Sequence, residues 1–504
     1  MKTHSLTLLC SFIMLATLTN GAARAAETTP IDIGSRRELL VDNYLIDKSS
    51  GETRLVLHKP TPRKIAIVHD EPWEGNSCGY HTVFRDGDLY RMYYKCYQQV
   101  LRGEPKPHKV VACYAQSRDG INWTKPKLGL VEFDGSKQNN IIWEGDAAHD
   151  FTPFKDTNPN CKPDERYKAV AHDKSPGSGL YAFKSTDGIR WTRLSDKPLI
   201  TGRALDSQNL AFWDTERGEY RAYYRDFKHG IRDIVVSTSK DFSDWTPGRW
   251  LEYPGAPVQQ LYTNQIIPYY RAPHIFLGFP SRYIERGWND SMRKLPRLDH
   301  RKKRSDASNR EGMALTDGLF MSSRDGKTFK RWSEAFIRPG LRTTDNWVYG
   351  DNYQNWGLVE TKSSMLDAPD EISIYATEAY WMGKADKLRR FTMRQDGFVS
   401  MQASFAGGEF TTKPIAFEGN RLEMNFSTSA AGAICVEIQD ADGKPIPGFT
   451  LKDSSPVFGD DLQRTVTWKS GADVGPLAGK PVRLRFTLSD ADLFSFQFVK
   501  WLSP

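Results

Sequence analysis

The sequence predicts an all-β protein, and three observations support this prediction. Short runs that alternate apolar with polar residues, or that are rich in β-branched and aromatic residues, recur along the chain between Gly, Pro, Asp and Asn. A turn sequence recurs with them, and no long stretch has the periodicity of a helix. The repeats stop near Ala403, where a different set of strands begins. Together these features predict a five-bladed β-propeller followed by a C-terminal β-sandwich.

The repeated turn is Asp-Gly followed by an aromatic residue, usually with Ser before it. Asp-Gly closes a tight turn because glycine tolerates a positive φ. The third copy has Phe242 in place of Gly, and the fifth is truncated. The five copies are SRDGINW (117–123), STDGIRW (185–191), SKDFSDW (239–245), SRDGKTF (323–329) and RQDGF (394–398).

Each turn follows a series of predicted strands, as in GYHTVF (79–84), LYRMYYKCY (89–97) and KVVACYAQS (109–117). Sheets of four strands repeated around an axis are typical of a propeller. The segments ELLVDNYLI (38–46) and TRLVLHKP (53–60) are expected to close the ring against the last sheet. The alternative is an extended antiparallel sandwich in which the Asp-Gly turns recur by coincidence.

The C-terminal strands and the N-terminus complete the predicted organisation. After Ala403 the chain has strand sequences such as RLEMNFS (421–427), AICVEIQD (433–440), VRLRFTLS (482–489) and FSFQFV (494–499). Residues 1–25 combine a basic start, an apolar run and the small-x-small sequence Ala23-Arg24-Ala25, as in an export signal. We therefore predict a signal peptide (1–25), a propeller (26–402) and a sandwich (403–504).

Composition narrows the classes of protein. The protein is expected to be secreted or periplasmic after cleavage near Ala25, without a membrane anchor. The net charge of +7 is mild for 504 residues, which argues against nucleic acid as a partner. Sparse cysteines argue against a disulfide framework, although Cys96 and Cys113 lie on neighbouring predicted strands and could form one bridge. No two cysteines have the spacing of a metal site, and we predict none.

Polar side chains are expected to gather at one end of the propeller. The starts of the inner strands and the ends of the second strands lie on one face, around the central funnel. Carboxylates, histidines, arginines and amides occupy these positions, where a purely structural propeller would not need them. The residues selected in this way are Glu74, His81, His149, Asp150, Asp206, Asn209, Arg225, Glu285, Glu378 and Trp381.

This arrangement resembles the five-bladed propeller glycoside hydrolases of families 32, 43, 62, 117 and 130. The C-terminal strands resemble the accessory sandwich of the family 32 enzymes, and PWEG (72–75) resembles a segment of other exported propeller proteins. The resemblance covers nearly the whole mature chain but is architectural, since the Trp-Met-Asn-Asp-Pro, Arg-Asp-Pro and Glu-Cys motifs of family 32 are absent. It implies an exported glycoside hydrolase with a carbohydrate substrate and no cofactor, and leaves open a structural Ca²⁺.

Hydrolysis of a glycosidic bond requires two carboxyl groups, one as acid and one as base or nucleophile. The resemblance places them on the first inner strands, which makes Glu74, Asp150 and Asp206 catalytic candidates. Glu378 is a fourth, because a carboxylate within an apolar strand must be paired or functional. The structural alternatives are a strand-capping role for Asp150 and Asp206 and a solvated loop for Glu74.

The remaining residues are expected to bind the substrate: His81, His149, Asn209, Arg225, Glu285 and Trp381. The family 117 resemblance implies that His81 or His149 could serve as the acid. A structural hydrogen bond is the alternative for each histidine, and packing is the alternative for Trp381.

A basic insertion between Arg282 and Arg310 contains RKKR (301–304). It is expected to be either a mobile, solvated loop or a lid that favours anionic glycans through its charge. Two other functions stay open: a non-catalytic glycan-binding propeller, and a glycoside phosphorylase in which Arg225 holds phosphate.

Overall fold

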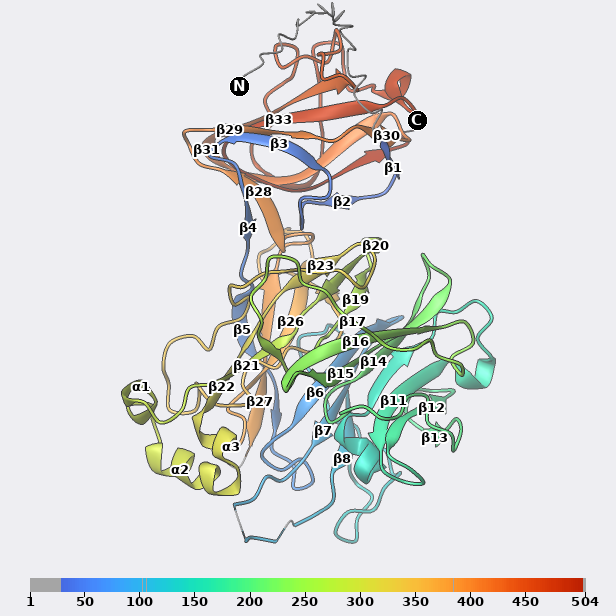
Figure 1. Ribbon diagram of the computed structural model, residues 1–504, viewed down its shortest axis with the longest axis vertical. Helices are drawn as coiled ribbons and strands as arrows, with labels where there is room; N and C mark the ends of the chain where they lie inside the picture. Colours follow the sequence, from blue (N-terminus) through green and yellow to red (C-terminus); the bar gives the residue numbers. More distant parts are fainter. Residues whose placement is uncertain (1–28, 102, 106, 384, 502–504) are drawn as a thin grey trace, which may run out of the picture.

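A computed structural model describes residues 29–101, 103–105, 107–383 and 385–501 (Figure 1). The protein is mostly β-structure with few helices, which confirms the predicted class. The predicted signal peptide lies outside the described residues. None of the helices in the described ranges is long and apolar enough to cross a membrane.

Five antiparallel sheets of four strands dominate the described part of the chain, and their strands coincide with the repeated runs of the sequence. A three-stranded sheet of β18 (Gln260–Leu261), β21 (Ser281–Glu285) and β22 (Ala314–Gly318) adjoins the fourth. The sheets are, in order, β6 (Gly79–Asp86), β7 (Leu89–Cys96), β8 (Val111–Ser117) and β9 (Ile141–Glu144); β10 (Thr152–Lys155), β11 (Tyr167–Asp173), β12 (Gly179–Ser185) and β13 (Thr192–Arg193); β14 (Leu210–Asp214), β15 (Glu219–Lys228), β16 (Ile231–Ser239) and β17 (Arg249–Trp250); β19 (Ile267–Tyr269), β20 (Ala272–Gly278), β23 (Met321–Ser323) and β24 (Lys330–Arg331); and β25 (Val359–Thr361), β26 (Glu371–Glu378), β27 (Asp386–Met393) and β5 (Thr61–His69).

Buried amides connect the first strands of these sheets. Gln208 Nε2 donates to the carbonyl of Tyr80 at 3.0 Å. Gln265 Nε2 donates to Gln208 Oε1 at 2.6 Å and to the carbonyl of Gln354 at 2.8 Å. The segments that lead into the inner strands of the third, fourth and fifth sheets therefore contact one another and β6 of the first sheet.

The repeated turns have the expected geometry. Asp119 Oδ1 accepts the N–H groups of Ile121 and Asn122, each at 2.8 Å. Ser117 Oγ accepts the N–H of Gly120, whose φ is 69°. The carboxylates of Asp187, Asp241 and Asp325 make the same pairs of bonds. The Ser and Asp side chains thus bind the backbone N–H groups of the turn, which explains why the same motif recurs.

A strand from the beginning of the chain completes the fifth sheet. β5 pairs antiparallel with β27, with His69 opposite Asp386 and Ile67 opposite Leu388. The prediction that 38–46 and 53–60 play this part is wrong, because strands in that region pair elsewhere. Alternation marks such a segment as a strand, but it does not identify the partner strand.

The C-terminal strands form one ten-stranded sheet together with residues 31–57, at the upper end of the molecule in Figure 1. The runs expected as separate strands join into β31 and β33, which pair along most of their length. Aromatic and aliphatic side chains such as Phe410, Phe486 and Phe496 form the core. The strands are β1 (Ile31–Gly34), β2 (Glu38–Leu39), β3 (Ile46–Gly51), β4 (Arg54–Leu57), β28 (Val399–Ala403), β29 (Gly408–Thr412), β30 (Ile415–Phe417), β31 (Arg421–Asp440), β32 (Asp460–Thr465) and β33 (Val482–Val499).

The cysteines of the described chain are free. Cys96 lies opposite Val111, and Cys113 lies opposite Tyr94. The bridge considered between Cys96 and Cys113 is therefore wrong, because the strand register does not place the two residues opposite each other.

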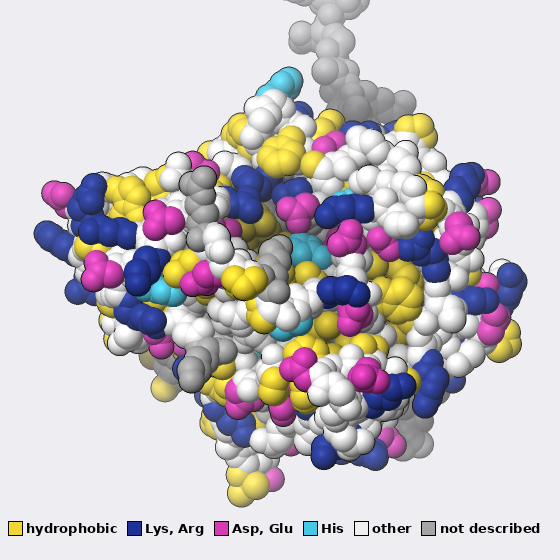
Figure 2. Space-filling view, turned by 90° about the horizontal axis from the view of Figure 1, so that it is seen from below, with side chains coloured by type: hydrophobic (Ala, Val, Ile, Leu, Met, Phe, Trp, Pro, Cys, Tyr) yellow, Lys and Arg dark blue, Asp and Glu magenta, His cyan; other side chains and the backbone are white. Residues whose placement is uncertain are grey.

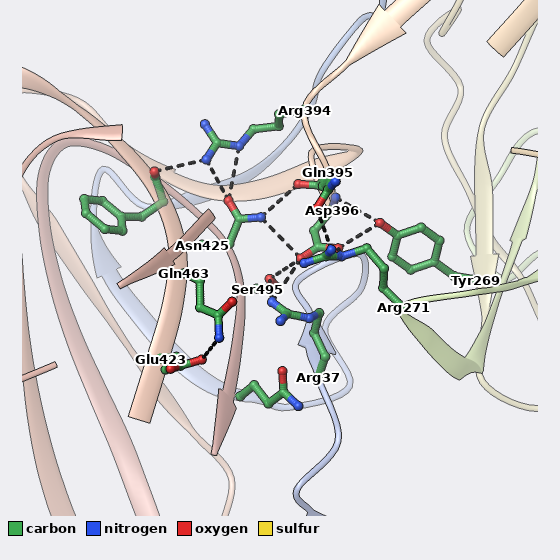
Figure 3. A network of polar contacts seen from close by, with 12 residues as sticks. Arg37, Tyr269, Arg271, Arg394, Gln395, Asp396, Glu423, Asn425, Gln463 and Ser495 are labelled. Atoms are coloured by element: carbon green, nitrogen blue, oxygen red, sulfur yellow. Dashed lines mark hydrogen bonds and ion pairs between the residues drawn. The ribbon is translucent and has the colours of Figure 1, made fainter. Parts of the chain in front are cut away.

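Asp396 joins the fifth sheet to the C-terminal sheet (Figure 3). Its buried carboxylate accepts hydrogen bonds from Tyr269 Oη at 2.8 Å, Arg271 Nε at 2.9 Å and Ser495 Oγ at 2.8 Å. Burial alone would raise its pKa, but Arg271 and Arg37 outweigh burial and hold the pKa below its ordinary value. The truncated fifth turn thus supplies the carboxylate that links the two parts.

We expect Asp396→Ala to lower the free energy of unfolding by about 3–5 kcal/mol, because it leaves the partly buried guanidinium groups of Arg37 and Arg271 without their partner. Urea unfolding followed by tryptophan fluorescence measures this. Since the folded pKa lies below the unfolded value of about 3.9, the stabilisation is complete above that pH and disappears as the pH falls through the folded pKa. Asp460→Ala is the control, because its exposed pair with Arg394 should contribute only about 0–1 kcal/mol. Equal losses in the two variants would contradict this assignment.

Candidate active site

A cluster of tyrosines lies at the end of the first five sheets that faces away from the C-terminal sheet. Tyr262 stacks on Tyr353 with ring centroids 5.3 Å apart, and Tyr349 Oη donates to Tyr262 Oη at 2.7 Å. Figure 2 shows this end of the molecule, with histidine and hydrophobic side chains near the centre and charged side chains around them. The tyrosine cluster consists of Tyr80, Tyr262, Tyr283, Tyr349, Tyr353 and Tyr380.

Lys95 points its ammonium group at this cluster from the end of β7. Nζ lies 4.7 Å from the centre of the Tyr80 ring and 5.9 Å from that of Tyr380. The side chain is buried and forms no ion pair with any residue of the described chain. Burial opposes its charge, but the nearby tyrosines and Asp206 outweigh burial and raise the pKa of Lys95. Lys95 is therefore a cation available to a negatively charged or polar ligand.

His149 and Asp206 flank the cluster. His149 Nδ1 lies 3.7 Å from Asp206 Oδ1, and its ring meets that of Tyr80 edge-on at 5.6 Å. Burial and the charge of Lys95 lower the pKa of His149 to about 3 despite the neighbouring carboxylate. Partial desolvation would raise the pKa of Asp206, whose side chain is 60% exposed, but His149, Arg225 and Lys95 outweigh it and lower this pKa. At neutral pH the site thus presents a neutral imidazole and an ionised carboxylate.

Glu311 is a second carboxyl group at the cluster, and sequence reasoning missed it. It lies on α3 (Asn309–Met313), and its charge acts on Tyr349 and Tyr380. Burial raises its pKa, and Arg304, Arg310 and Lys95 offset this only in part. Oε2 has no hydrogen-bond partner within the described residues, and the nearest guanidinium atom, Arg304 Nη2, lies 3.7 Å away. Glu311 therefore retains its proton more readily than an ordinary glutamate.

The basic insertion is helical, so the expectation of a mobile, solvated loop is wrong. It contains α1 (Asp290–Arg293) and α2 (Leu298–Ala307), followed by α3. Arg301 Nη1 donates to the carbonyl of Trp347 at 2.6 Å, and Arg304 Nη1 donates to that of Tyr380 at 2.9 Å. Both arginines are buried. Their charges fasten the helix to the loops of the tyrosine cluster and do not form a basic surface.

Asp150 occupies a position that recurs in three sheets, which we call the latch. At each latch, a side-chain oxygen just before the inner strand accepts a backbone N–H of the second strand. Asp150 Oδ1 accepts the N–H of His172 at 3.0 Å, just as Asn209 Oδ1 accepts that of Arg225 at 3.2 Å and Asn355 Oδ1 accepts that of Tyr375 at 2.7 Å. Asp150 Oδ2 also accepts from Asn209 Nδ2 at 3.0 Å. Burial raises the pKa of Asp150 well above its ordinary value. These contacts are those of the strand-capping alternative.

Glu74 lies apart from the tyrosine cluster in a completed network. Oε2 pairs with Lys125 Nζ at 2.6 Å, and Oε1 accepts from Tyr94 Oη at 2.7 Å. Both oxygens are engaged and the side chain is buried, so Glu74 stabilises the loop before β6.

Glu378 faces a side groove of about 500 Å³ that Asn346 and Asp351 also line. Arg389 binds it through Nε at 2.8 Å and Nη2 at 3.1 Å. The sequence left Glu378 either paired or functional, and the structure shows it paired with Arg389.

The other expected substrate contacts are dispersed. His81 is buried and pairs with His69, while Arg225 Nε donates to the carbonyl of Ala204 at 2.9 Å. Glu285 is exposed and accepts from Tyr283 Oη at 2.6 Å. Trp381 is covered by Arg304, whose guanidinium lies 4.8 Å from the ring centre. Of the expected residues, Asp206, His149 and Glu285 lie at the tyrosine cluster with side chains open to solvent.

The positions of the tyrosines could have been recognised from the sequence. Tyr80, Tyr262 and Tyr353 precede or begin inner strands, and Tyr283 and Tyr380 lie on or just after the strands that leave them. The positional criterion that selected charged residues would therefore have selected these tyrosines. Glu311 carried no such signal, because it belongs to the insertion.

No protein-family model and no curated protein matches the sequence. Among solved structures, an N-acetylgalactosamine deacetylase from F. plautii in complex with blood group B trisaccharide has 10% identity and a TM-score of 0.43 over 67% of this chain and 96% of that one. A glycosyl hydrolase from Bacteroides ovatus has 13% identity and a TM-score of 0.38 over 70% and 97% of the two chains. A fructofuranosidase from Schwanniomyces occidentalis complexed with fructosylnystose has 11% identity and a TM-score of 0.36 over 89% and 99%.

The chain resembles five-bladed propeller glycoside hydrolases at low sequence identity. At these identities and TM-scores, the similarity extends only to the arrangement of the strands. Activity has to be inferred from the side chains of this chain.

We expect Asp150→Asn to keep the free energy of unfolding within about 1 kcal/mol, because Asn fills the same latch at 209 and 355. Asp150→Ala should lose about 1–3 kcal/mol, because it leaves the buried N–H of His172 without a partner. Urea unfolding of both variants at pH 7 measures the difference. A loss in Asp150→Asn as large as that in Asp150→Ala would contradict the latch role.

Proposed function

We propose that the protein hydrolyses a glycosidic bond in an oligo- or polysaccharide, with Glu311 as general acid and Asp206 as the ionised base or nucleophile. One observation supports this assignment above the others. Two carboxyl groups flank one tyrosine cluster, and their surroundings displace their pKa values in opposite directions. Glycoside hydrolysis needs such a pair, one carboxyl protonated and one ionised.

The groups between the two carboxyls suit a sugar. Tyrosine rings can pack against the apolar face of a pyranose or furanose, and a tyrosine hydroxyl can also bond a sugar hydroxyl. Lys95 and Arg310 add positive charge beside the rings, with the Arg310 guanidinium 5.6 Å from the centre of the Tyr349 ring. We propose that these cations select glycans that carry a carboxylate or sulfate.

We propose that the five four-stranded sheets are the blades of one propeller, closed by β5, that the C-terminal strands form an accessory sandwich, and that the protein is exported. The proposed boundaries are 26–402 and 403–504. Residues 31–57 would then cross from the first part of the chain into the sandwich, since β1 to β4 pair with its strands. This crossing is what allows β5 to reach the fifth sheet.

Glu311→Gln and Asp206→Asn are each expected to lower kcat by about 10²–10⁴-fold, the usual effect of losing general acid–base catalysis. Release of reducing ends from a panel of neutral and acidic oligosaccharides measures kcat, and calorimetry measures binding. The rate should fall at low pH as Asp206 takes up a proton, and at high pH as Glu311 loses one above its raised pKa. Glu311→Gln should remove the second dependence.

Glu378→Gln is the matched control, because its carboxylate is paired with Arg389 away from the tyrosine cluster. Full turnover in both Glu311→Gln and Asp206→Asn would overturn the assignment. Binding of sugars by the wild-type protein without any release would identify a glycan-binding protein. Release that requires phosphate would identify a phosphorylase.

Lys95→Met tests the preference for acidic glycans. The variant keeps the length of the side chain but removes a charge whose hydrogen bond to an anion contributes about 1.5–3 kcal/mol. We expect kcat/KM to fall about 10–100-fold for a uronate-containing or sulfated substrate and only a few-fold for a neutral one. Lys302→Met, at an exposed position of α2, is the control. Equal losses on both substrates would contradict a role in charge recognition.

A further inference from the structure

Three side chains from distant parts of the sequence converge where the first and fifth sheets meet. His69 ends β5, Cys78 immediately precedes β6, and Asp386 begins β27. A ring nitrogen, the sulfur and a carboxylate oxygen from these residues all lie within 4.8 Å of one another. The relative exposures are 0%, 0% and 1%, so water does not compensate these polar atoms. We call this group the seam cluster.

The seam cluster contains buried atoms without hydrogen-bond partners. His69 Nδ1 lies 2.8 Å from Asp386 Oδ1, yet neither atom has a partner of hydrogen-bond geometry in the described chain. Asp386 Oδ2 also has none. The Cys78 thiol makes weak contacts, to the carbonyl of Glu74 at 3.3 Å and to the thiol of Cys96. A buried carboxylate whose polar contacts are limited to His69 and the backbone N–H of Cys78 is costly, and a bound cation would reduce this cost.

The second nitrogen of His69 fits a metal ligand. Nε2 lies 3.2 Å from His81 Nε2. Such a contact between two ring nitrogens is a hydrogen bond in which one imidazole donates and the other accepts, and His69 can be the donor. In that arrangement the N–H of His69 points to His81, and Nδ1 presents its lone pair to Cys78 and Asp386. Metal-binding histidines are usually oriented by such a bond from their other nitrogen.

We propose that His69, Cys78 and Asp386 bind one Zn²⁺ ion. The donors are an imidazole nitrogen, a sulfur and carboxylate oxygens, the types that Zn²⁺ takes in proteins. Asp386 contributes one or two oxygens, giving three or four ligand atoms. Ligand atoms of a tetrahedral ion at about 2.0–2.3 Å lie about 3.3–3.8 Å apart, and the three atoms here lie within 4.8 Å of one another, so small side-chain shifts would complete the site. Binding releases the proton of the Cys78 thiol.

The position of the site indicates a structural role. It connects the strand that completes the fifth sheet with the loop that begins the first sheet. An ion that binds only when these segments are together stabilises the folded protein. The site uses neither Glu311 nor Asp206, so it is independent of the proposed hydrolysis.

The test uses the full-length mature protein, stripped with a chelator and refilled with Zn²⁺ or Co²⁺. Mass spectrometry of the metal should find one equivalent of Zn²⁺ per chain, and refilling should raise Tm. The Co²⁺ form should show thiolate-to-metal charge-transfer absorption. Cys78→Ser should lose that absorption and lower the affinity for Zn²⁺ by more than about 100-fold, beyond the 10–100-fold typical of losing an outer contact.

Cys435→Ser is the matched control, since this free cysteine lies in the C-terminal sheet. It should bind Zn²⁺ and Co²⁺ like the wild-type protein. Less than stoichiometric binding by the refilled wild-type protein, or the same Co²⁺ spectrum in Cys78→Ser, would overturn the proposal. If Cys78→Ser does not fold, the wild-type Co²⁺ spectrum decides, because absence of thiolate absorption would overturn it.

Discussion

Hydrogen bonds between buried amides, just before the inner strands, link four of the five four-stranded sheets. Gln208, Gln265 and Gln354 exchange bonds across sheets that are distant in sequence. Each amide is buried, so each needs those partners, and the first strands can satisfy them only by meeting at one centre. The latches of Asp150 and Asn209 extend the same principle outward, from the inner strand of a sheet to its second strand.

The candidate site consists of side chains that take no part in these amide hydrogen bonds. Lys95 is held over aromatic rings without an ion pair in the described chain, and Glu311 is buried beside guanidinium groups without a hydrogen bond to Oε2. Buried charged groups with few hydrogen bonds are costly for folding, and they are typical of sites that act on a ligand. The buried arginines of α2 have the opposite role, because each guanidinium is occupied by backbone carbonyls.

Much of the fold was predictable because its signals are local. The Ser-Asp turns need only a few adjacent residues, so the motif and the structure agree even where Phe242 adopts a φ of 69° in place of glycine. The end of the repeat near Ala403 was also a local change. The pairing of β2 to β4 with the C-terminal strands was not predictable, because alternation shows that a segment is a strand and not which strand lies beside it.

The strands, the turns and the expected positions of Asp206 and His149 follow from the sequence, because short-range patterns and a repeated unit specify them. Tertiary packing establishes that Arg301 and Arg304 are buried, that Glu311 lies at the tyrosine cluster and that His69, Cys78 and Asp386 converge. The environment of a charged group depends on what packs against it from other sheets. Contacts between residues hundreds of positions apart leave no trace in the local pattern of either segment.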